Sequence, residues 1–429
     1  MKRRVLIVTS TYMPAMAADM HRARLLAWEL PKLGWDVEIL SPDATFQPIS
    51  WIDPDSAPLF APGITIHSVS AFCSLCFRLL GIGNIGWRAI LPMYHAGLRL
   101  LKQRHFDLIY ISTAHFPLFL LGILWRRHKV PFVLDFHDPL FNGEAIVFVP
   151  EHIKRAIAHW LSQYIESRCA RAAAGVIAVS PEYIATLRHR YATDKPGWFS
   201  LGRAAVIPFP AAPRDLAIAG SGVRQENDVR TRRVVYVGTG GPIMRQSFEV
   251  FCSTLSLLQE QEPELLASLR FEFYGTSPSN REGEVTTFTA IARAHAVSDF
   301  VFEYPQRVSY RRSIELLLSS DGALVLGVDD SGYMPSKLFN YALSGKPLLA
   351  ALRAGSTAFT FFQGAANLGH VIEFGEAEEA DCSERTQTLR TFVREVVARK
   401  SFDRRSMLEP YLASNSAARH VEVFDACLT

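Results

Sequence analysis

The chain has 429 residues, of which 49% are hydrophobic and 20% are charged. This composition excludes a disordered or fibrous protein, and the length favours two domains over one compact core. The net charge of +3 is uneven: residues 1–205 hold 22 Lys and Arg against 15 Asp and Glu, a net of +7, and the remainder has a net of −4. A basic N-terminal half suits an anionic membrane surface or a phosphorylated acceptor, and it also suits an ordinary solvated face.

No stretch approaches the roughly 20 apolar residues of a membrane-spanning helix. The basic residues after Met1 lead into a short strand, which does not resemble a signal peptide. The six cysteines are scattered, and the single pair Cys73-Ser-Leu-Cys76 has no second pair at zinc spacing, so a structural role is favoured over a metal or redox one. We therefore expect a cytoplasmic protein, free or at the inner face of the membrane, with no metal, no cofactor and no nucleic-acid partner.

The first half alternates short apolar runs with amphipathic helical patterns. Strand candidates are 5–10, 37–40, 64–67, 107–112, 130–135, 175–180 and 205–208; helix candidates are 20–33, parts of 71–105 on either side of a break at Gly81-Ile-Gly83, 116–128, 151–174 and 181–190. The loop after the first strand holds no GxGxxG, so a dinucleotide fingerprint is absent. The alternation predicts a doubly wound parallel sheet.

Residues 210–232 lose this pattern and are rich in Pro, Ala, Gly, Ser and charges, which indicates a linker. The alternation then restarts, with strands at 234–238, 269–275, 300–304, 322–328, 348–352 and 369–374 and helices at 246–260, 310–320, 335–344 and from 383 onward. We therefore predict an α/β protein with two Rossmann-like, doubly wound parallel-sheet domains facing a cleft. The N-terminal domain covers 1–209, the linker 210–232 and the C-terminal domain 233–404.

One stretch, Pro335-Ser-Lys-Leu-Phe-Asn-Tyr-Ala-Leu-Ser-Gly-Lys-Pro347, follows a buried strand and a polar turn. Pro335 suits the first position of a helix, and Gly345 suits its end. The N–H groups of Ser336 and Lys337 would then lie at the positive end of a helix above the carboxyl ends of a sheet, where phosphate-bearing ligands bind in α/β folds. An ordinary crossover helix with a solvent-facing lysine fits the pattern equally well.

The ordered set of motifs resembles the GT-B glycosyltransferases of the family 4 type over nearly the whole chain. The matching blocks are Val5-Leu-Ile-Val-Thr-Ser-Thr-Tyr12, Arg22-Ala-Arg-Leu-Leu-Ala-Trp-Glu-Leu30, Gly34-Trp-Asp-Val-Glu-Ile-Leu40, Phe132-Val-Leu-Asp-Phe-His-Asp-Pro139, Gly175-Val-Ile-Ala-Val-Ser-Pro181, Val235-Tyr-Val-Gly238 and the stretch from Pro335 to Pro347. The resemblance implies a nucleotide-sugar donor on the C-terminal domain and an acceptor on the N-terminal one. It also implies metal-independent transfer with retention at the anomeric carbon, and a last helix, about 405–429, that packs back on the N-terminal domain.

The resemblance also implies roles for individual residues. His137 matches the family's histidine near the transferred sugar, where an imidazole can hydrogen-bond a hydroxyl; a capping or core histidine is the alternative. Arg245 matches a basic residue on the donor diphosphate, beyond the glycine-rich turn with Gly240 and Gly241. Ser336 and Lys337 match the helix start near the phosphates.

The sequence departs from the family at several of these places. Two glutamates that the family often has around this helix fall on Gly332 and Asn340; Asn340 can still bond a ribose hydroxyl, without a charge-assisted bond. Asp330, or its neighbour Asp329, either replaces the first glutamate or binds only water in the turn. An arginine of the family falls on Thr239, and paired glycines of the first loop fall on 16–19.

The resemblance thus implies a hexosyltransferase that moves a sugar from a nucleotide diphosphate sugar to a glycan or lipid-linked acceptor in the synthesis of cell-surface polysaccharide or glycoconjugate. The alternatives are a nucleotide-sugar 2-epimerase-like isomerase of the same architecture, and a non-catalytic subunit that binds a glycan or a partner transferase. Peripheral membrane contact through the basic N-terminal half is a further expectation.

Overall fold

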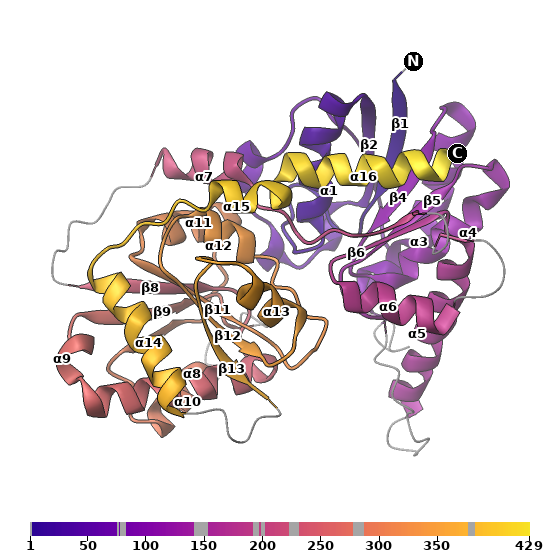
Figure 1. Ribbon diagram of the computed structural model, residues 1–429. Helices are drawn as coiled ribbons and strands as arrows, with labels where there is room; N and C mark the ends of the chain where they lie inside the picture. The colour runs from indigo at the N-terminus through magenta and orange to yellow at the C-terminus, as the bar shows by residue number, and fades with distance from the viewer. Residues whose placement is uncertain are drawn as a thin grey trace. The chain divides into compact units, whose positions relative to one another are not determined.

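The computed structural model describes residues 2–74, 77, 83–140, 153–191, 197–198, 202–222, 231–277, 287–375 and 382–429. Cys76, the predicted helix break at Gly81 and residues 223–230 of the predicted linker lie outside these ranges. The chain divides into two compact units (Figure 1), the first of Met1–Pro208 with Ala413–Thr429 and the second of Phe209–Leu412. Each unit is built around one sheet.

Unit 1 contains a seven-stranded, entirely parallel sheet in the order β3-β2-β1-β4-β5-β6-β7. Its strands are β1 (Arg3–Val8), β2 (Trp35–Pro42), β3 (Thr65–Val69), β4 (Leu108–Ser112), β5 (Phe132–Phe136), β6 (Gly175–Ala178) and β7 (Ala204–Val206). The connecting helices are α1 (Met20–Glu29), α3 (Ile85–Gln103), α4 (Leu120–Trp125), α5 (Ile153–Ala172) and α6 (Pro181–Tyr191). Strands β4, β5 and β6 are buried along their whole length, because helices cover both faces of a doubly wound sheet.

Unit 2 repeats this plan with a six-stranded parallel sheet in the order β10-β9-β8-β11-β12-β13. Its strands are β8 (Arg232–Val237), β9 (Leu269–Tyr274), β10 (Val301–Tyr304), β11 (Gly322–Leu326), β12 (Leu348–Arg353) and β13 (His370–Phe374). Its helices are α7 (Pro213–Gly220), α8 (Arg245–Gln261), α9 (Pro263–Leu266), α10 (Thr287–Ala294), α11 (Tyr310–Ser319), α12 (Leu338–Leu343), α13 (Thr357–Gly364), α14 (Cys382–Val397) and α15 (Arg405–Leu408). Two Rossmann-like, doubly wound α/β units are therefore confirmed.

The strand order reverses direction once in each sheet, between β1 and β4 in unit 1 and between β8 and β11 in unit 2. Ligands of open α/β sheets bind outside the carboxyl ends of the strands at such a reversal. The segments that follow β1, β4 and β5, and those that follow β8 and β11, are thus the places where the fold itself predicts a site.

The hydrophobic core of unit 2 contains residues that recur at helical spacing on α8. On α8, the buried residues Phe248, Phe251, Leu255 and Leu258 recur every three or four positions and face the sheet. Phe248 packs edge-on against Phe273 at a centroid distance of 5.1 Å and stacks on Phe288 at 4.2 Å. Burial of such large aromatic side chains removes apolar surface from water and so stabilises unit 2.

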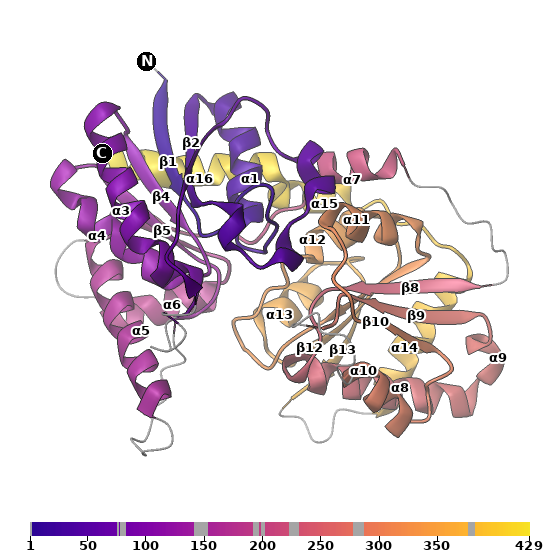
Figure 2. The same ribbon diagram turned by 180° about the vertical axis from the view of Figure 1, so that it is seen from behind.

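The last helix, α16 (Ala413–Leu428), belongs to unit 1 although it ends the chain. Its buried residues recur at helical spacing, and Figure 2 shows it behind α1 and the first strands; the buried set is Ala413, Ser416, Ala417, His420, Val423, Phe424 and Cys427. Phe424 contacts Trp35 of β2 edge-on at 5.5 Å. The sheet of unit 1 is therefore covered partly by residues more than 200 positions away in sequence.

Two elements differ from the predictions. Part of the predicted linker, Pro213–Gly220, forms α7, because Pro213 opens a helix that packs on α11 and buries Asp215 and Ala219. Helix α12 begins at Leu338, whereas the sequence predicts a start at Pro335; the Leu338 N–H bonds to the Pro335 carbonyl, so 335–337 form a turn before the helix. None of the described helices is both long and apolar enough to cross a membrane.

Candidate functional site

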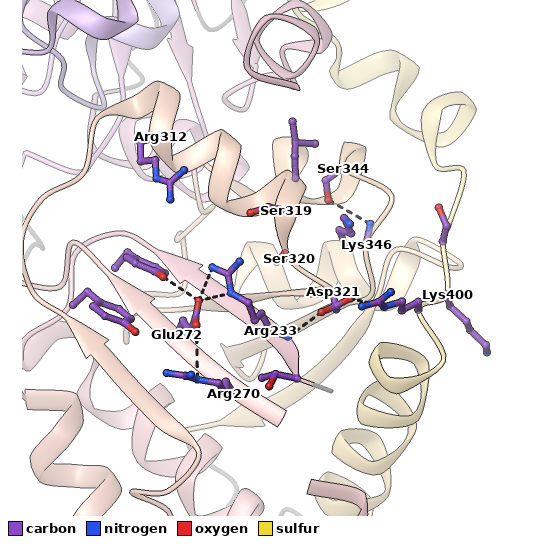
Figure 3. A pocket seen from close by; sticks show the side chains of 16 residues that line it. Arg233, Arg270, Glu272, Arg312, Ser319, Ser320, Asp321, Ser344, Lys346 and Lys400 are labelled. Atoms are coloured by element: carbon purple, nitrogen blue, oxygen red, sulfur yellow. Dashed lines mark hydrogen bonds and ion pairs between the residues drawn. The ribbon is translucent and has the colours of Figure 1, made fainter. Parts of the chain in front are cut away.

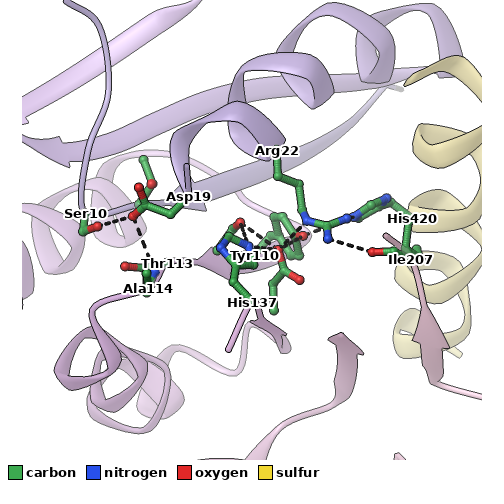
Figure 4. Close-up of polar contacts among 12 residues, drawn as sticks. Ser10, Asp19, Arg22, Tyr110, Thr113, Ala114, His137, Ile207 and His420 are labelled. Carbon is green, nitrogen blue, oxygen red and sulfur yellow. Dashed lines mark hydrogen bonds and ion pairs between the residues drawn. The ribbon is translucent and has the colours of Figure 1, made fainter. Parts of the chain in front are cut away.

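His137 follows the carboxyl end of β5 in unit 1 and is almost completely buried. Its Nε2 lies 2.7 Å from Asp135 Oδ2 and 3.1 Å from Ser112 Oγ (Figure 4). Because a carboxylate only accepts hydrogen bonds, Nε2 carries the proton that points to Asp135. The structure therefore fixes the orientation of the imidazole and turns Nδ1 away from the carboxylate.

Asp135 is the centre of this cluster. Its Oδ2 accepts hydrogen bonds from the Tyr110 hydroxyl at 2.7 Å and the Ser112 hydroxyl at 2.8 Å, and Arg22 Nε lies 2.8 Å away. Burial by itself would raise the pKa of Asp135, but Arg22 and His137 outweigh burial and hold that pKa well below its usual range. The cluster therefore contains a permanent anion that orients two neighbouring donors and the histidine.

Helix α16 supplies a second histidine on the far side of Arg22. His420 Nδ1 donates to the Ser416 carbonyl at 2.7 Å, so Nε2 is the unprotonated nitrogen, and it faces Arg22 Nη1 at 3.5 Å. Burial, followed by the charge of Arg22, lowers the pKa of His420 to about 3. Arg22 also donates to the Ile207 carbonyl at 2.7 Å, so this one guanidinium joins α1, β5, α16 and the segment after β7.

A smaller polar group lies at the ends of β1 and β4 (Figure 4). The Ser10 hydroxyl donates to Asp19 Oδ2, and His115 Nδ1 lies 2.9 Å from Ser10 Oγ. Since the single hydroxyl proton of Ser10 goes to Asp19, His115 must donate through Nδ1. These side chains and His137 all follow the carboxyl ends of central strands, which is where a hydroxyl-rich ligand would meet unit 1.

In unit 2, Lys337 contacts the loop after β8. Its Nζ donates to the Val237 carbonyl at 2.8 Å and lies 4.0 Å from the centre of the Tyr236 ring. Burial lowers the pKa of Lys337 to about 7. The sequence left two alternatives for Lys337, a lysine that faces a phosphate and a lysine that faces solvent. In the structure its ammonium lies against the backbone of β8, at the strand-order reversal.

The glycine-rich loop needs its glycines for three different reasons. A Cβ at Gly238, which has φ of +156°, would lie 2.1 Å from Lys337 Nζ. A Cβ at Gly240 would lie 2.9 Å from Thr276 Cβ, and Gly241 has φ of +86°. Only glycine reconciles this backbone path with the lysine beside it. Gly240 and Gly241 thus shape the loop, and the next predicted residue, Arg245, begins α8 with an exposed side chain paired to Glu249 at 2.8 Å.

Of the remaining residues predicted to bind the donor, Ser336 is accessible to a ligand, whereas the side chains of Asn340 and Asp330 are hydrogen-bonded within the protein. Ser336 is exposed, and within the described ranges neither its backbone N–H nor that of Lys337 has a hydrogen-bond partner. Asn340 Oδ1 accepts from the Ala212 N–H at 2.8 Å and its Nδ2 donates to the Tyr310 hydroxyl at 3.2 Å, so the amide holds the segment before α7. Asp330 Oδ1 accepts from the Gly332 N–H at 2.8 Å and stabilises its own turn.

Sequence reasoning did not single out Asp135, Arg22, Tyr110 or Ser112, although all four lie in predicted elements. The available signal was polar residues inside apolar strands, as in Leu108-Ile-Tyr-Ile-Ser112 and Phe132-Val-Leu-Asp135. A buried polar group requires a partner, but the identity of that partner depends on strand order, which brings β4 next to β5.

Comparison with known proteins agrees with this geometry. Residues 21–196 match the model of the glycosyl transferase 4-like domain. The match covers 176 of the 429 residues, so the N-terminal half contains a glycosyltransferase 4-like domain. The predicted GT-B, family 4-like type is thereby confirmed, while a search among functionally curated proteins finds no significant match.

Solved structures of similar fold extend over the whole chain. The Anabaena HepE structure in complex with UDP is 16% identical, with a TM-score of 0.58 over 98% of this chain and 99% of that one. A UDP-forming trehalose-phosphate synthase from Burkholderia xenovorans is 13% identical, with a TM-score of 0.62 over 100% of both chains. An E. coli trehalose-6-phosphate structure bound with UDP-2-fluoro glucose is 12% identical, with a TM-score of 0.63 over 98% of both. At these identities the likeness shows the GT-B fold.

Proposed function

We propose that the protein transfers a hexosyl group from a nucleotide diphosphate sugar, with retention at the anomeric carbon, to a glycan or lipid-linked acceptor. The observation that carries the proposal is the position of Lys337, which lies against the glycine loop at the strand-order reversal of unit 2. The open N–H groups of Ser336 and Lys337 lie on the same turn. Relatives of the same fold have been solved with UDP and with a UDP-sugar analogue, which supports a uridine diphosphate sugar as the first donor to test.

In this proposal the bond between the anomeric carbon and the diphosphate breaks, and the acceptor oxygen forms the new bond. Negative charge then develops on the departing diphosphate, where Lys337, the two backbone N–H groups and Arg245 stabilise it. A lysine with a pKa of about 7 is only partly charged at neutral pH, so a diphosphate beside it would draw a proton onto Nζ. His137, oriented by Asp135, provides a hydrogen bond to the sugar; no nucleophilic role is assigned to it.

The test is turnover of UDP-glucose and other nucleotide sugars by the purified protein, with and without candidate acceptors. Lys337→Ala is expected to lower kcat by about 100-fold, within the range found when one transition-state donor is removed. The matched control is Lys32→Ala, which removes an exposed lysine paired to Glu29 in unit 1. Equal turnover by Lys337→Ala and the wild type would contradict the assigned role. Rearranged sugar formed without any acceptor would indicate the isomerase.

A non-catalytic binding subunit is the second candidate, and one observation favours it. The family position that often carries a ribose-binding glutamate holds Asn340, and both ends of its amide are bonded to Ala212 and Tyr310. Titration calorimetry distinguishes the two candidates before any activity is measured. A transferase must bind at least one nucleotide sugar, whereas the absence of binding across UDP-, GDP- and ADP-sugars would favour the subunit.

We also propose that unit 1 meets its acceptor at an anionic membrane surface. On α5 the side chains of Ile157, Trp160 and Tyr164 are 50%, 58% and 45% exposed, and they recur at the spacing of one helical face. Trp160 stacks on Tyr164 at 5.7 Å, and the Arg168 guanidinium lies 5.6 Å from the Tyr164 ring. Aromatic side chains beside basic ones are typical of helices that lie in the membrane interface.

A hollow beside this face is also lined by apolar, aromatic and basic side chains. It has a volume of about 830 Å³, and no acidic residue of the described ranges lines it; its lining is Tyr94, Leu120, Ile123, Leu124, Arg126, Arg127, Tyr164, Arg168, Arg171 and Ala172. Each basic residue near an anionic bilayer contributes about 1 kcal/mol of attraction. The four arginines and the exposed apolar face therefore favour a lipid surface over a soluble glycan alone.

Sedimentation with vesicles tests the membrane contact. The protein is expected to bind phosphatidylglycerol-containing vesicles and not pure phosphatidylcholine vesicles, and added salt should release it. Trp160→Ser and the double change Arg168→Gln with Arg171→Gln should each weaken binding. Ile49→Ser, which removes another highly exposed apolar side chain of unit 1, should not. Binding that ignores both lipid charge and these substitutions would contradict the proposal.

A further inference from the structure

A second hollow in unit 2 extends from the amino ends of β8, β11 and β12 along β9 to Tyr274 and Tyr304, the last residues of β9 and β10 (Figure 3). Four charged residues line it near the strand starts. Arg233 and Arg270 are the second residues of β8 and β9, Asp321 lies just before β11, and Lys346 lies just before β12. Because all of these strands are parallel, their starts meet at one edge, and the charged residues there lie away from the glycine loop that follows the end of β8. The volume is about 620 Å³, which is within the range of small-molecule sites.

The hollow is strongly basic. Among the described residues, Glu272 and Asp321 are the acids that line it, against six basic residues: Arg233, Arg270, Arg312, Lys346, Arg399 and Lys400. The whole of Phe209–Leu412 contains 22 Lys and Arg and 25 Asp and Glu, a net charge of −3. The excess of four positive charges around one hollow is therefore a local concentration of charge in an otherwise acidic unit, and such a concentration attracts anions.

The two acids are already bonded within the protein. Glu272 Oε2 accepts from Arg233 Nη2 at 2.8 Å and from the Tyr274 hydroxyl at 3.0 Å. Asp321 accepts from the Arg233 backbone N–H at 3.0 Å and pairs with Arg399 Nε at 3.1 Å. Arg312 and Lys400 each pair, at 3.3 Å, with an acid that does not line the hollow.

Of the six cations, Arg270 and Lys346 have the weakest contacts to acids in the described part of the chain. Arg270 Nε is 4.0 Å from Glu272 Oε1 and makes no hydrogen bond in the described part of the chain, although it is shielded from solvent. The Arg270 guanidinium lies over the Phe302 ring at 3.9 Å, which fixes its plane. Lys346 forms no ion pair with any described residue, and burial lowers its pKa, while Asp321 opposes that shift and Arg399 adds to it. A desolvated ammonium gains more from an anion than an exposed one does.

An aromatic wall completes the hollow. Tyr274 and Tyr304 both line it, with their rings stacked at 4.6 Å and 11° apart. A rigid pair of phenol rings keeps its shape without a ligand, so little conformational freedom would be lost on binding. The volume also exceeds the needs of a single sulfate or phosphate ion.

We infer that this hollow is a binding site for a small polyanion, a molecule with two or more phosphate groups, which Arg270 and Lys346 contact directly. The site is distinct from the donor site proposed above, because Arg270 and Lys346 lie at or just before the starts of β9 and β12, whereas Lys337 contacts the end of β8 and is not among the described residues that line the hollow. Either site could exist without the other. The ligand chemistry is phosphate ester or anhydride; a planar fork on Arg270 and a point charge on Lys346 suit two phosphate groups held apart.

Titration calorimetry with inorganic tripolyphosphate tests the site in the full-length protein. Arg270→Gln and Lys346→Gln are each expected to raise Kd about tenfold or more, as the loss of one charge-assisted hydrogen bond requires. Arg293→Gln, an exposed arginine of α10 outside the hollow, is the matched control and should bind as the wild type does. Arg270→Lys keeps the positive charge but loses the planar guanidinium, so its Kd should lie between those of the wild type and Arg270→Gln.

A further variant separates this site from the donor site, since tripolyphosphate also resembles a nucleotide diphosphate. Lys337→Ala should leave binding at the hollow intact. Binding that is lost in Lys337→Ala and kept in Arg270→Gln would overturn the inference, as would the absence of binding or equal affinity for inorganic sulfate. Melting curves show whether each variant is folded. If Arg270→Gln does not fold, the Kd of Arg270→Lys tests the role of Arg270 instead.

Discussion

At the scale of single residues, Asp135 organises the polar interior of unit 1. It is completely buried, and its Oδ2 receives contacts from Arg22, Tyr110, Ser112 and His137. A buried anion is stable only while its partners remain, because desolvation is then balanced by several charge-assisted contacts. The candidate site of unit 1 therefore depends on a residue that need not touch a substrate.

Asp135→Asn is expected to destabilise the protein by about 3–5 kcal/mol, since it leaves the Arg22 guanidinium buried without its counter-charge. Urea denaturation followed by tryptophan fluorescence measures the effect. Asp425→Asn, which breaks an exposed pair with Arg3, should cost less than about 1 kcal/mol. An equal, small effect of both substitutions would show that the buried cluster is not a major source of stability.

Lys337 provides a pH test at the same scale. Its pKa is about 7 in the folded protein, against 10.5 for an unperturbed lysine, so between these pH values the unfolded chain binds more protons than the native one. Stability due to this group therefore rises as the pH increases from about 7 toward 10, and below pH 7 the full penalty of a buried ammonium applies. The free energy of unfolding of the wild type minus that of Lys337→Met should increase over this range. A difference that stays flat with pH would mean that the ammonium is solvated.

At the scale of elements, the loop from Gly238 to Gly241 and the turn before α12 form one unit. The side chain of Lys337 fills the space that a Cβ at Gly238 would occupy, and Tyr341 of α12 accepts from the Val237 N–H at 3.0 Å. The strand end, the loop and the short helix are therefore positioned by one another, and a change in one of them is transmitted to the others.

Gly238→Ala is expected to destabilise unit 2 by roughly 1–3 kcal/mol through backbone strain and displacement of Lys337. If the donor site is at this loop, the same substitution should also weaken nucleotide binding. Thermal melting with and without UDP measures both effects. Gly364→Ala is the control, because a Cβ at this position at the end of α13 meets nothing within 4 Å. A melting temperature unchanged by Gly238→Ala would exclude the proposed packing.

At the scale of the whole molecule, the chain order and the spatial units do not coincide. Unit 1 contains the first 208 residues and the last 17, and unit 2 lies between them in sequence. The final helix supplies His420 and Phe424 to the interior of unit 1, where Tyr110 contacts both. The fold of unit 1 therefore requires α16, which follows all of unit 2 in the sequence.

A chain that stops at Leu412 is expected to lose the fold of unit 1, since removal of Phe424 alone corresponds to about 3–5 kcal/mol of core stability. Hydrogen exchange should show loss of amide protection in β1, β4 and β5. The strands of unit 2 should stay protected, because their sheet and core lie within Phe209–Leu412. Removal of Thr429 only is the control. Retained protection in β1 after the longer truncation would refute the structural role of α16.

The doubly wound plan and the approximate position of nearly every strand can be predicted from the sequence alone, because buried parallel strands and amphipathic helices have strong local periodicities. The sequence also located the segments at the strand ends, including His137, the glycine loop and Lys337. Local pattern was insufficient where proline and small residues indicated a linker: Pro213–Gly220 is a helix that packs on α11, a contact between distant segments.

Only the tertiary structure decided what the candidate residues touch. Asn340 has the right chemistry for a ribose hydroxyl, yet its amide is bonded to Ala212 and Tyr310; Lys337 has the right charge for a phosphate, yet in the free protein it donates to Val237. The hollow with Arg270 and Lys346 joins residues from several strand starts, which no spacing in the sequence reveals. The physical reason is that periodicity reports which side of an element is buried, whereas a hydrogen bond or a charge cluster depends on which elements the sheet order makes neighbours.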